Sequence, residues 1–394
     1  MPAVETPAPA PAGPPGPKTE PFMLDLIKEA DRQLTICNAC RYCEGYCAVW
    51  PAMELRRTFT PSDILYLANL CFDCRACYYA CQFAPPHQFA VNIPEIFAEI
   101  RTETYQDYSW PRLLARMVKS NAKAAVIITT ICVVAVFVLV LLARGPGVLF
   151  TAHTGDGAFF RVVPYMAMVA PASAISLFVL VLFGVGAVRF WRDTGGSATD
   201  IVSWAAFQKA TADALGLRYL KGDGSGCTYP DEQFSHTRRM FHHLTFYGFM
   251  LDLASTTTAA IYHHGFHWES PYPLLSVPVV LGTVGGIMLM AGTAGLLYLK
   301  WKADRVPGTT TMMQMDVSFI LILFLTSLTG MLLLILRETP AMGTLLAIHL
   351  GVVAAFFIMI PYGKLAHVVY RYSALVRNAI EQRRVAAEDA ANAH

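Results

Sequence analysis

Two stretches, 37–47 (CNACRYCEGYC) and 71–81 (CFDCRACYYAC), carry four cysteines each with the same spacing, C-x2-C-x2-C-x3-C. Two-cluster proteins use this spacing to bind a pair of [4Fe–4S] clusters, and the fourth cysteine of each run ligates the other cluster. The spacing therefore predicts one set of ligands at Cys37, Cys40, Cys43 and Cys81, and a second set at Cys47, Cys71, Cys74 and Cys77. The pattern departs from its usual form at one point, because the proline that normally follows the last cysteine is displaced to Pro51 and to Pro85–Pro86.

Zinc binding and disulfide formation are the two alternatives for closely spaced cysteines. A zinc knuckle draws two ligands from each of two turns, so the seventh and eighth cysteines would be surplus. Disulfides between residues i and i+3 of a tight loop have poor geometry. Cluster thiolates also need a reducing compartment, which in a bacterial cell is the cytoplasmic side. Of the two remaining cysteines, we expect Cys132 to be an inert packing residue in an apolar block and Cys227 to be a free thiol in a glycine-rich loop.

The composition is that of a membrane protein. Hydrophobic residues make up 55% and charged residues 15% of the 394 residues. A soluble domain carries about 25% charged residues, so much of this chain must face lipid. Six apolar blocks approach the ~20 residues that a membrane-spanning helix needs, at 124–143, 165–188, 240–262, 274–299, 315–336 and 342–364. No basic face with interleaved aromatic residues is present outside the loops, which argues against nucleic acid as a partner.

The blocks divide the chain into four segments. Residues 1–20 are rich in proline and alanine and lack an apolar h-region, which predicts a disordered tail rather than a signal peptide. We expect a cytoplasmic cluster domain at 21–122, a six-span membrane domain at 123–368 and a cytoplasmic tail at 369–394. Within the cluster domain, helices are predicted at 23–33 and from the start signal Thr60-Pro61-Ser62-Asp63 to Leu70, with an amphipathic stretch at 93–101. Segment 203–217 fits either an amphipathic surface helix or a linker.

The distribution of lysine and arginine predicts the orientation in the membrane. The first, third and fifth loops hold only Arg144, Arg161 and Arg337. The second and fourth loops and the tail are richer, with Arg189, Arg192, Lys209, Arg218, Lys221, Arg238, Arg239, Lys300, Lys302, Arg305, Arg371, Arg377, Arg383 and Arg384. A basic collar of Arg112, Arg116, Lys119 and Lys123 precedes the first span. The even loops and both termini are therefore predicted to be cytoplasmic, on the side of the cysteine runs.

Histidines are concentrated at the ends of the third span and in the sixth. His349 and His367 are 18 residues apart, which on one continuous helix places both rings on one face about 27 Å apart. With the two helices antiparallel, His242 lies level with His367, and His263 with His349, so that these pairs could ligate one or two b-type haems. His242 is preferred to its neighbour His243, because it lies closer to the face of His263 at about 100° per residue. No C-x-x-C-H is present, so covalent haem attachment is not expected.

Other polar and small residues of the spans have simpler expected roles. His264 and His267 lie at a helix end and are expected to be interfacial anchors. Asp252 and Asp316 are expected to be polar partners inside the bundle or interfacial groups, with a place in a proton path as a further alternative for Asp252. The glycines within 282–286 and 292–295 are expected to permit close helix packing.

The two cysteine runs, the phrase at 239–249 (RMFHHLTFYGF), and Ser270-Pro271-Tyr272-Pro273 followed by Pro278 and segment 282–286 resemble the tricarballylate-utilization protein B family (TcuB, also called CitB). The resemblance covers about residues 24–385, and the chain is also similar to the C-terminal half of the CobZ flavohaemoprotein of cobalamin synthesis. Sequence and resemblance together predict a mainly α fold, in which an α-helical, ferredoxin-like domain with two [4Fe–4S] clusters precedes a six-helix transmembrane b-type cytochrome bundle. The family's eight cluster ligands carry over onto the eight cysteines. Its haem ligands carry over less securely, because His242 competes with His243, and His263 with His264.

The resemblance implies a function. Members of that family take electrons from a partner flavoprotein that dehydrogenates tricarballylate, and pass them to the quinone pool. We therefore expect an electron-transfer subunit of the bacterial inner membrane that reoxidises an FAD-containing dehydrogenase through two clusters and b-type haem. No G-x-G-x-x-G follows a strand and the soluble segment is too short for a Rossmann domain, so the substrate chemistry must occur on the partner. The alternatives are a CobZ-like component that supports a flavoprotein oxygenase in cobalamin biosynthesis, and a membrane anchor or ion transporter with vestigial clusters.

Overall fold

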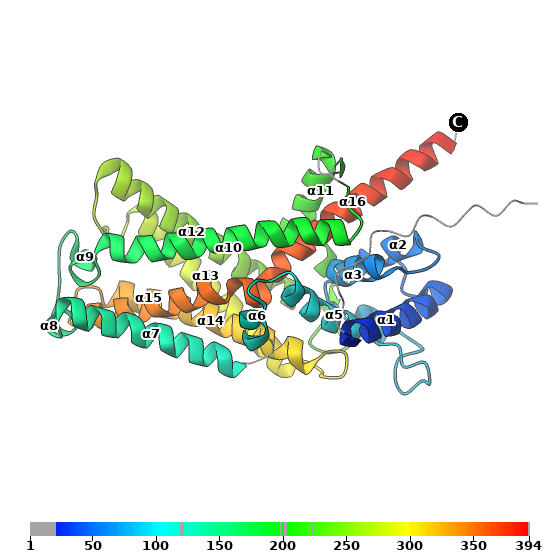
Figure 1. Ribbon diagram of the computed structural model, residues 1–394, viewed down its shortest axis with the longest axis horizontal. Coiled ribbons are helices and arrows are strands. Elements are labelled where there is room, and N and C mark those ends of the chain that lie inside the picture. Colours follow the sequence, from blue (N-terminus) through cyan, green and yellow to red (C-terminus); the bar gives the residue numbers. More distant parts are fainter. Residues whose placement is uncertain (1–20, 119–121, 198, 201–202, 223, 393–394) are drawn as a thin grey trace, which may run out of the picture.

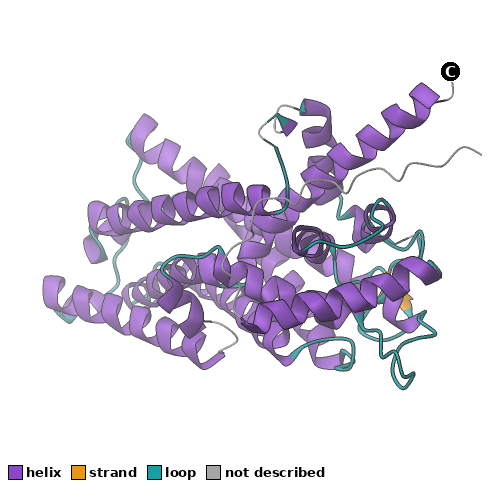
Figure 2. Cartoon of the chain, turned by 45° about the vertical axis from the view of Figure 1, so that its right-hand side comes forward, coloured by secondary structure: helices purple, strands orange, loops and turns teal. Residues whose placement is uncertain are grey.

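The computed structural model describes residues 21–394 except 119–121, 198, 201–202, 223 and 393–394. The predicted tail, 1–20, and Lys119 of the basic collar lie outside the described residues. The molecule is elongated, with the cysteine-bearing helices at one end and a bundle of long helices at the other (Figure 1). The described part is helical apart from one antiparallel pair of two-residue strands, β1 (Cys227–Thr228) and β2 (Phe234–Ser235) (Figure 2).

Five helices build the cysteine-bearing end. They are α1 (Pro21–Cys40), α2 (Val49–Glu54), α3 (Pro61–Leu70), α4 (Ala76–Tyr79) and α5 (Ile93–Asp107). The predicted start signal is confirmed, because the Thr60 hydroxyl accepts from the Asp63 backbone N–H while the Asp63 carboxylate accepts from the Thr60 backbone N–H. Asn92 caps α5 in the same way, by accepting from the backbone N–H of Glu95. Both caps set the direction in which the chain leaves a cysteine run.

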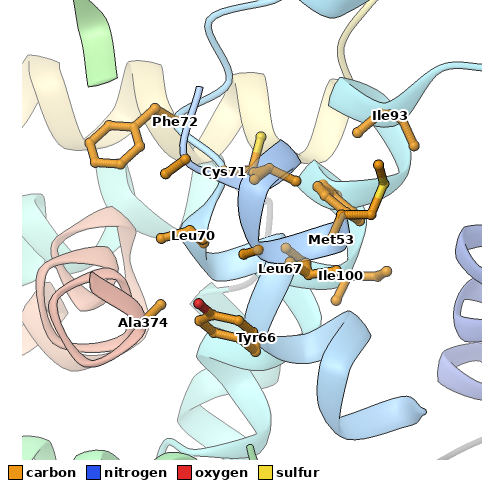
Figure 3. Packing of buried hydrophobic residues seen from close by; sticks show 14 of the residues in the cluster. Met53, Tyr66, Leu67, Leu70, Cys71, Phe72, Ile93, Ile100 and Ala374 are labelled. Atoms are coloured by element: carbon orange, nitrogen blue, oxygen red, sulfur yellow. The ribbon is translucent and has the colours of Figure 1, made fainter. Parts of the chain in front are cut away.

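A hydrophobic core holds the second cysteine run in place. Helices α1, α3 and α5 pack together, and α3 is buried from Ile64 to Leu70. Cys71 follows α3 directly, above Leu67 and Leu70 of α3, and Ala374 of the C-terminal helix lies beside Tyr66 on the other side (Figure 3). Each fully buried side chain of this kind stabilises the fold by about 1.5–3 kcal/mol relative to an exposed one. The loop that carries Cys71 and Cys74 therefore starts from a rigid helix end.

Six long helices form the bundle, and each overlaps one of the predicted apolar blocks. They are α7 (Ala122–Arg144), α10 (Tyr165–Asp193), α12 (Thr237–Phe266), α13 (Val277–Lys302), α14 (Thr310–Ile335) and α15 (Met342–Met359). Among the described residues, five helices are long and apolar enough to cross a membrane, α15 with the turn that follows it being one of them. Helix α12 is not among the five, although it is 30 residues long. It carries His242, His243 and Asp252 within the block, which lowers its apolar character.

The connections at the two ends of the bundle differ. At the end near the cysteines, Arg75 donates to the Asp304 carbonyl (2.8 Å) and Asn92 to the Val306 carbonyl (3.1 Å), both in the loop between α13 and α14. At the far end, Arg337 after α14 donates to the Tyr272 carbonyl between α12 and α13 (2.7 Å). The even loops thus lie with the cysteine runs and the odd loops lie opposite.

Short helices fill the connections. Helix α6 (Arg112–Val118) precedes the first long helix, α8 (Gly147–Phe150) and α9 (Ala158–Val162) lie in the first loop, and α11 (Trp204–Leu215) with the turn Arg218–Leu220 lies in the second. Segment 203–217 is therefore a helix. It packs against the C-terminal helix rather than standing free, since Ala206 and Ala210 are fully buried and the Thr211 hydroxyl bonds the Tyr372 hydroxyl (2.7 Å).

The expectation that His349 and His367 share one continuous helix is wrong. Helix α15 ends at Met359, two 3-10 turns follow at Ile360–Tyr362 and Lys364–Ala366, and α16 (His367–Asn392) begins at His367 itself. The cause is local, because Pro361 has no backbone N–H to continue the helix and Gly363 between the turns is extended. The two rings therefore do not share a helix face, and the spacing of about 27 Å that a straight helix would give does not apply.

Glycines of α13 allow it to lie against α12 along much of its length. A Cβ at Gly292 would lie 2.5 Å from the backbone nitrogen of Thr245, and one at Gly285 would lie 2.9 Å from the Gly248 carbonyl oxygen. Gly282 and Gly295 also face α12, whereas Gly286 faces Met331 and Ser327 of α14. The expected role of these glycines in close packing is confirmed.

We predict that Gly292→Ala lowers the melting temperature of the detergent-solubilised protein. The added methyl meets backbone atoms that cannot move independently, so α12 and α13 must separate, at a cost of about 1–3 kcal/mol. The matched control is Gly184→Ala on α10, where a Cβ meets nothing within 4 Å. There, alanine's better helix propensity should leave the melting temperature equal or higher. Equal behaviour of the two variants would show that the helices do not approach at Gly292.

A network of charged side chains joins the cysteine-bearing end to α16. Arg56 donates to Asp63 and to Glu381 (both 2.6 Å), and Arg377 also pairs with Glu381 (3.1 Å) and with Asp63 (3.6 Å). All four side chains are no more than 16% exposed, and both guanidinium groups lie over the ring of Tyr66. Burial alone would raise the pKa of Asp63, but hydrogen bonds from Thr60 and Arg56 hold it below its ordinary value.

We therefore predict that Asp63→Asn destabilises the protein at neutral pH, by about 1–3 kcal/mol for a partly buried charged hydrogen bond. The folded-state pKa is depressed, so the stabilisation is present above the unfolded value near 4 and is lost as the pH falls through the folded value. Melting temperatures measured from pH 7 downward should converge for wild type and variant below about pH 4. Asp25→Asn, which removes an exposed pair with Lys28, is the control and should change little.

Candidate functional site

The structure gathers the eight cysteines into two neighbouring hollows, four cysteines in each. The first, which we name the inner site, is lined by Cys47, Cys71, Cys74 and Cys77. The second, the outer site, is lined by Cys37, Cys40, Cys43 and Cys81. Each site thus takes three cysteines from one run and the fourth from the other, which is the exchange that the spacing predicts. The two sites adjoin, since the Cys43 thiol lies 3.8 Å from the Cys77 carbonyl oxygen.

The two sites differ in their distance from solvent. At the inner site Cys71 and Cys74 are buried, and the loop before α12 covers them, because the Thr228 hydroxyl donates to the Cys74 carbonyl (3.2 Å). At the outer site all four cysteines are only partly buried, and the neighbouring Tyr42 is 68% exposed. The outer site therefore faces the surroundings and the inner site faces the bundle.

The chemistry of the cysteines fits a positively charged metal core. Burial raises the pKa of the Cys37 thiol, and the neighbouring thiols of Cys81 and Cys43 raise it further. Burial and the Cys81 thiol likewise raise the pKa of Cys43 to about 12. Thiols such as Cys37 and Cys43 therefore become thiolates at neutral pH only where a cation stabilises the negative charge, as coordinated iron does.

A single metal ion is a poorer fit. Among the described residues, no group of three or more His, Cys, Asp or Glu side chains is arranged to hold one ion. A four-iron cluster instead binds each thiolate at a separate corner, which requires a wider opening. The ten cysteines, all within the described residues, form no disulfide.

Trp50 lines both sites and Cys227 lies against one of their cysteines, and the cysteine spacing marks neither residue. Cys227, expected to be a free thiol, is 1% exposed, and its thiol lies against Cys74 and 3.3 Å from the Leu220 carbonyl oxygen. Trp50 is 3% exposed and lines both sites, and its indole N–H is buried without a partner among the described residues. No local pattern marks Cys227, which is over 150 residues from Cys74. The position of Trp50, three residues after Cys47, is the one available signal.

The loop of the inner site is held by arginines from three helices. Arg101 of α5 and Arg371 of α16 both donate to the Cys71 carbonyl (3.4 and 2.9 Å), and Arg238 of α12 donates to the Asp73 carbonyl. The guanidinium groups of Arg75 and Arg238 both lie over the ring of buried Tyr229, each 4.7 Å from its centre. The inner site is therefore surrounded by positive charge on the side of the bundle.

His242 of α12 and His367 of α16 both lie beside this arginine group. Arg371 is close enough to influence the charge of both imidazoles, and His242 is close enough to influence that of His367. The Nδ1 atom of His367 donates to the Lys364 carbonyl (2.5 Å), which leaves Nε2 as a free donor atom for a metal. The Nδ1 atom of His242 is buried without a partner among the described residues. The competing His243 points elsewhere, toward Tyr247 and Leu215.

The histidines of the far end face different helices. The Nδ1 atom of His349 forms a hydrogen bond with the Thr329 hydroxyl of α14 (3.0 Å), so its Nε2 takes no part in that bond. The ring packs closely on α14, because a Cβ at Gly330 would lie 3.1 Å from it. The His263 ring stacks on Tyr165 of α10 at 3.9 Å, and His264 bonds the Tyr165 hydroxyl (2.6 Å). The structure thus brings His242 to His367, but places His263 against α10 and His349 against α14.

Asp316 forms the polar centre of the bundle near the inner site. It pairs with Lys364 (2.7 Å) and with Lys300. Its expected role as a polar partner is confirmed by these two ion pairs, and it neutralises two lysines that would otherwise be buried alone. Asp252 faces Gly285 of α13, so it too lies inside the bundle.

These features define a class: a ferredoxin-like cysteine domain joined to a bundle of apolar helices, five of which could span a membrane. The model of the "Citrate utilization protein B Fer4-like domain" matches residues 30–107, and that of "Citrate utilization protein B" matches residues 117–388. The chain is 46% identical over 362 residues to a citrate utilization protein B of Escherichia coli, which covers 90% of this chain and 93% of that protein. No solved structure matches it. The chain belongs to the citrate utilization protein B family, and its ferredoxin-like domain indicates a role in electron transfer.

Proposed function

We propose that the protein is the membrane electron-transfer partner of an FAD-containing dehydrogenase that oxidises a tricarboxylate, tricarballylate in the first instance. The grouping of eight cysteines into two sites with exchanged fourth ligands carries this proposal. The family name of the Escherichia coli relative supports a place in tricarboxylate use. When bound, two [4Fe–4S] clusters and b-type haem would transfer single electrons from the reduced flavoprotein toward a membrane quinone.

The arrangement of the two sites supports electron transfer from the outer site, through the inner site, to the bundle. The outer site, beside exposed Tyr42 and Arg41, is accessible to a docking protein, whereas the inner site is covered by the loop before α12. The inner site in turn lies next to the arginines that reach His242 and His367. The outer site, the inner site and the histidine pair therefore follow one another from the solvent-facing end toward the bundle. The protein would hold a cofactor at each of them, exclude water and provide compensating charge.

The proposal includes an orientation. The cysteine-bearing end, the even loops and α16 lie at one end of the molecule, and these loops hold most of the basic residues. By the positive-inside rule, this end faces the cytoplasm of a bacterial inner membrane, and α12 serves as the sixth span within the bundle. Its His242 then points into the protein, where a span tolerates a polar side chain.

We propose that His242 and His367 would hold one b-type haem. A second haem held by His263 and His349 is proposed from the sequence pattern, since the structure places His263 against α10 and His349 against α14. The free Nε2 of His367 and its oriented Nδ1 are the features expected of an iron ligand. We predict that His367→Ala removes the reduced haem absorbance while the cluster signals persist, as seen by optical and EPR spectroscopy of the dithionite-reduced protein. His243→Ala, on the neighbouring position, is the control and should keep the haem spectrum. An unchanged spectrum in the His367 variant would refute the assignment.

The fourth cysteine of each run lies in the site of the other run, which leads to a prediction for serine variants. Cys81→Ser should damage the cluster held mainly by the first run, and Cys47→Ser the cluster held mainly by the second. The reason is that each serine removes a thiolate from the site in which the structure places it. EPR of partly reduced samples distinguishes the clusters, and iron analysis should show a loss of up to half of the cluster iron in each variant.

Two double variants test the pairing directly. Cys40→Ser with Cys81→Ser removes two ligands from the outer site and should leave the inner cluster's EPR signal. Cys40→Ser with Cys47→Ser removes one ligand from each site and should damage both. If the second pair spared one cluster, each run would bind its own cluster, contrary to the geometry. Cys132→Ser, far from both sites, is the control and should change neither signal.

A further inference from the structure

Two arginines occupy equivalent positions next to the histidine pair. Arg238 precedes His242 by four residues on α12, and Arg371 follows His367 by four residues on α16. Residues four apart lie on the same face of a helix, one turn from each other. In both helices the arginine is displaced from the histidine toward the inner site, since Arg238 reaches the Asp73 carbonyl and Arg371 the Cys71 carbonyl. Both guanidinium groups therefore lie between the two histidines and the inner site.

These guanidinium groups have hydrogen-bonding capacity left over. Each carries five N–H donors in a planar fork. The structure gives Arg371 one hydrogen bond, to Cys71, and its Nε is buried without a partner among the described residues. Arg238 also has one, to Asp73. Both are held in orientation by rings, Arg371 over Phe72 (4.6 Å) and Arg238 over Tyr229 (4.7 Å). Fixed forks with unused donors are a binding arrangement for carboxylates.

Positively charged side chains outnumber carboxylates around these two arginines. Asp316 is already paired with Lys300 and Lys364. The loop that contains Asp73 is surrounded by four arginines, Arg75, Arg101, Arg238 and Arg371. Asp73 is the carboxylate of this loop. Cations enclosed in a protein need anions nearby. Asp73 and the thiolates at the inner site supply part of that charge, and an anionic group between the two helices would supply more.

We propose that Arg238 and Arg371 bind the propionate carboxylates of a b-type haem held by His242 and His367, and so tie that haem to the loop of the inner site. This inference rests on the proposed function, because it takes a haem at this pair of histidines. The arginines are positioning residues. They neutralise the carboxylates, which favours the reduced haem, and their second hydrogen bond joins them to the backbone of Cys71 and Asp73.

The test compares neighbouring arginines in the purified full-length protein. Arg239 follows Arg238 but faces α11, where its Nε and Nη2 donate to the Gly216 carbonyl (3.2 and 2.8 Å). In optical redox titrations at fixed pH, we expect Arg238→Gln and Arg371→Gln each to reduce the ratio of reduced to oxidised haem about tenfold at a given potential, because the positive charge that is lost stabilises the reduced haem more than the oxidised haem. Arg239→Gln should titrate like wild type. Unchanged titrations in both variants would overturn the proposal.

A second measurement separates propionate binding from a general effect of charge. Haem-free protein is reconstituted with iron protoporphyrin IX or with its dimethyl ester, which lacks the carboxylates. Wild type should bind the ester at least tenfold more weakly, and Arg238→Gln/Arg371→Gln should lose this preference. Equal binding of the two haems by wild type would overturn the proposal. If the Gln variants fail to fold, Arg238→Lys and Arg371→Lys keep the charge without the fork and should show a reduced preference; a full preference would count against the proposal. A wild type without a bis-imidazole haem spectrum would instead refute the proposed function itself.

Discussion

The loop from Cys71 to Arg75 is the constraint on which the rest of the structure depends. It supplies two thiols to the inner site, and Asp73 and Arg75 within it adopt left-handed backbone conformations (φ 54° and 68°). Such conformations cost about 1–2 kcal/mol per residue for side chains other than glycine. The loop keeps them because its carbonyls accept hydrogen bonds from Arg101, Arg238 and Arg371. Those arginines come from α5, α12 and α16, so the cysteine-bearing end and the bundle are joined at the site itself.

This junction explains why positive charge is enclosed where the two parts meet. A thiolate-ligated iron cluster is anionic and would be costly to bury without compensation, and the same would hold for the haem propionates that we propose. Arginine suits the position better than lysine, since its fork can bond a backbone carbonyl and a carboxylate together. The guanidinium groups of Arg75 and Arg238 both pack on the buried ring of Tyr229, which helps to orient them.

Much of this could be predicted from the sequence, and the remainder depended on contacts between distant segments. The cysteine spacing predicts the exchanged grouping because four ligands within eleven residues leave little freedom. The start of α3 followed from Thr60 and Asp63, whose interaction is local. Hydrophobicity does not reveal the break before His367, because the apolar block continues through Pro361 and Gly363. Helix geometry favours His242 over His243, and the structure places His243 toward Tyr247 and Leu215. The contact of Cys227 with Cys74 had no local signal, because the loop before α12 folds back over a site more than 150 residues away.

Helix α16 shows how the break at Gly363 serves the site. A straight continuation of α15 would carry His367 and Arg371 past the inner site on a helix aligned with the bundle. The two 3-10 turns instead restart the helix at His367, with Ser109 of the cluster domain donating to the Pro361 carbonyl (2.7 Å) at the bend. From that point one helix presents His367 to His242, Arg371 to the Cys71 carbonyl, Ala374 to Tyr66 and Glu381 to Arg56. A single rigid element therefore sets the separation between the histidine pair and the inner site, which is the distance that electron transfer between them would depend on.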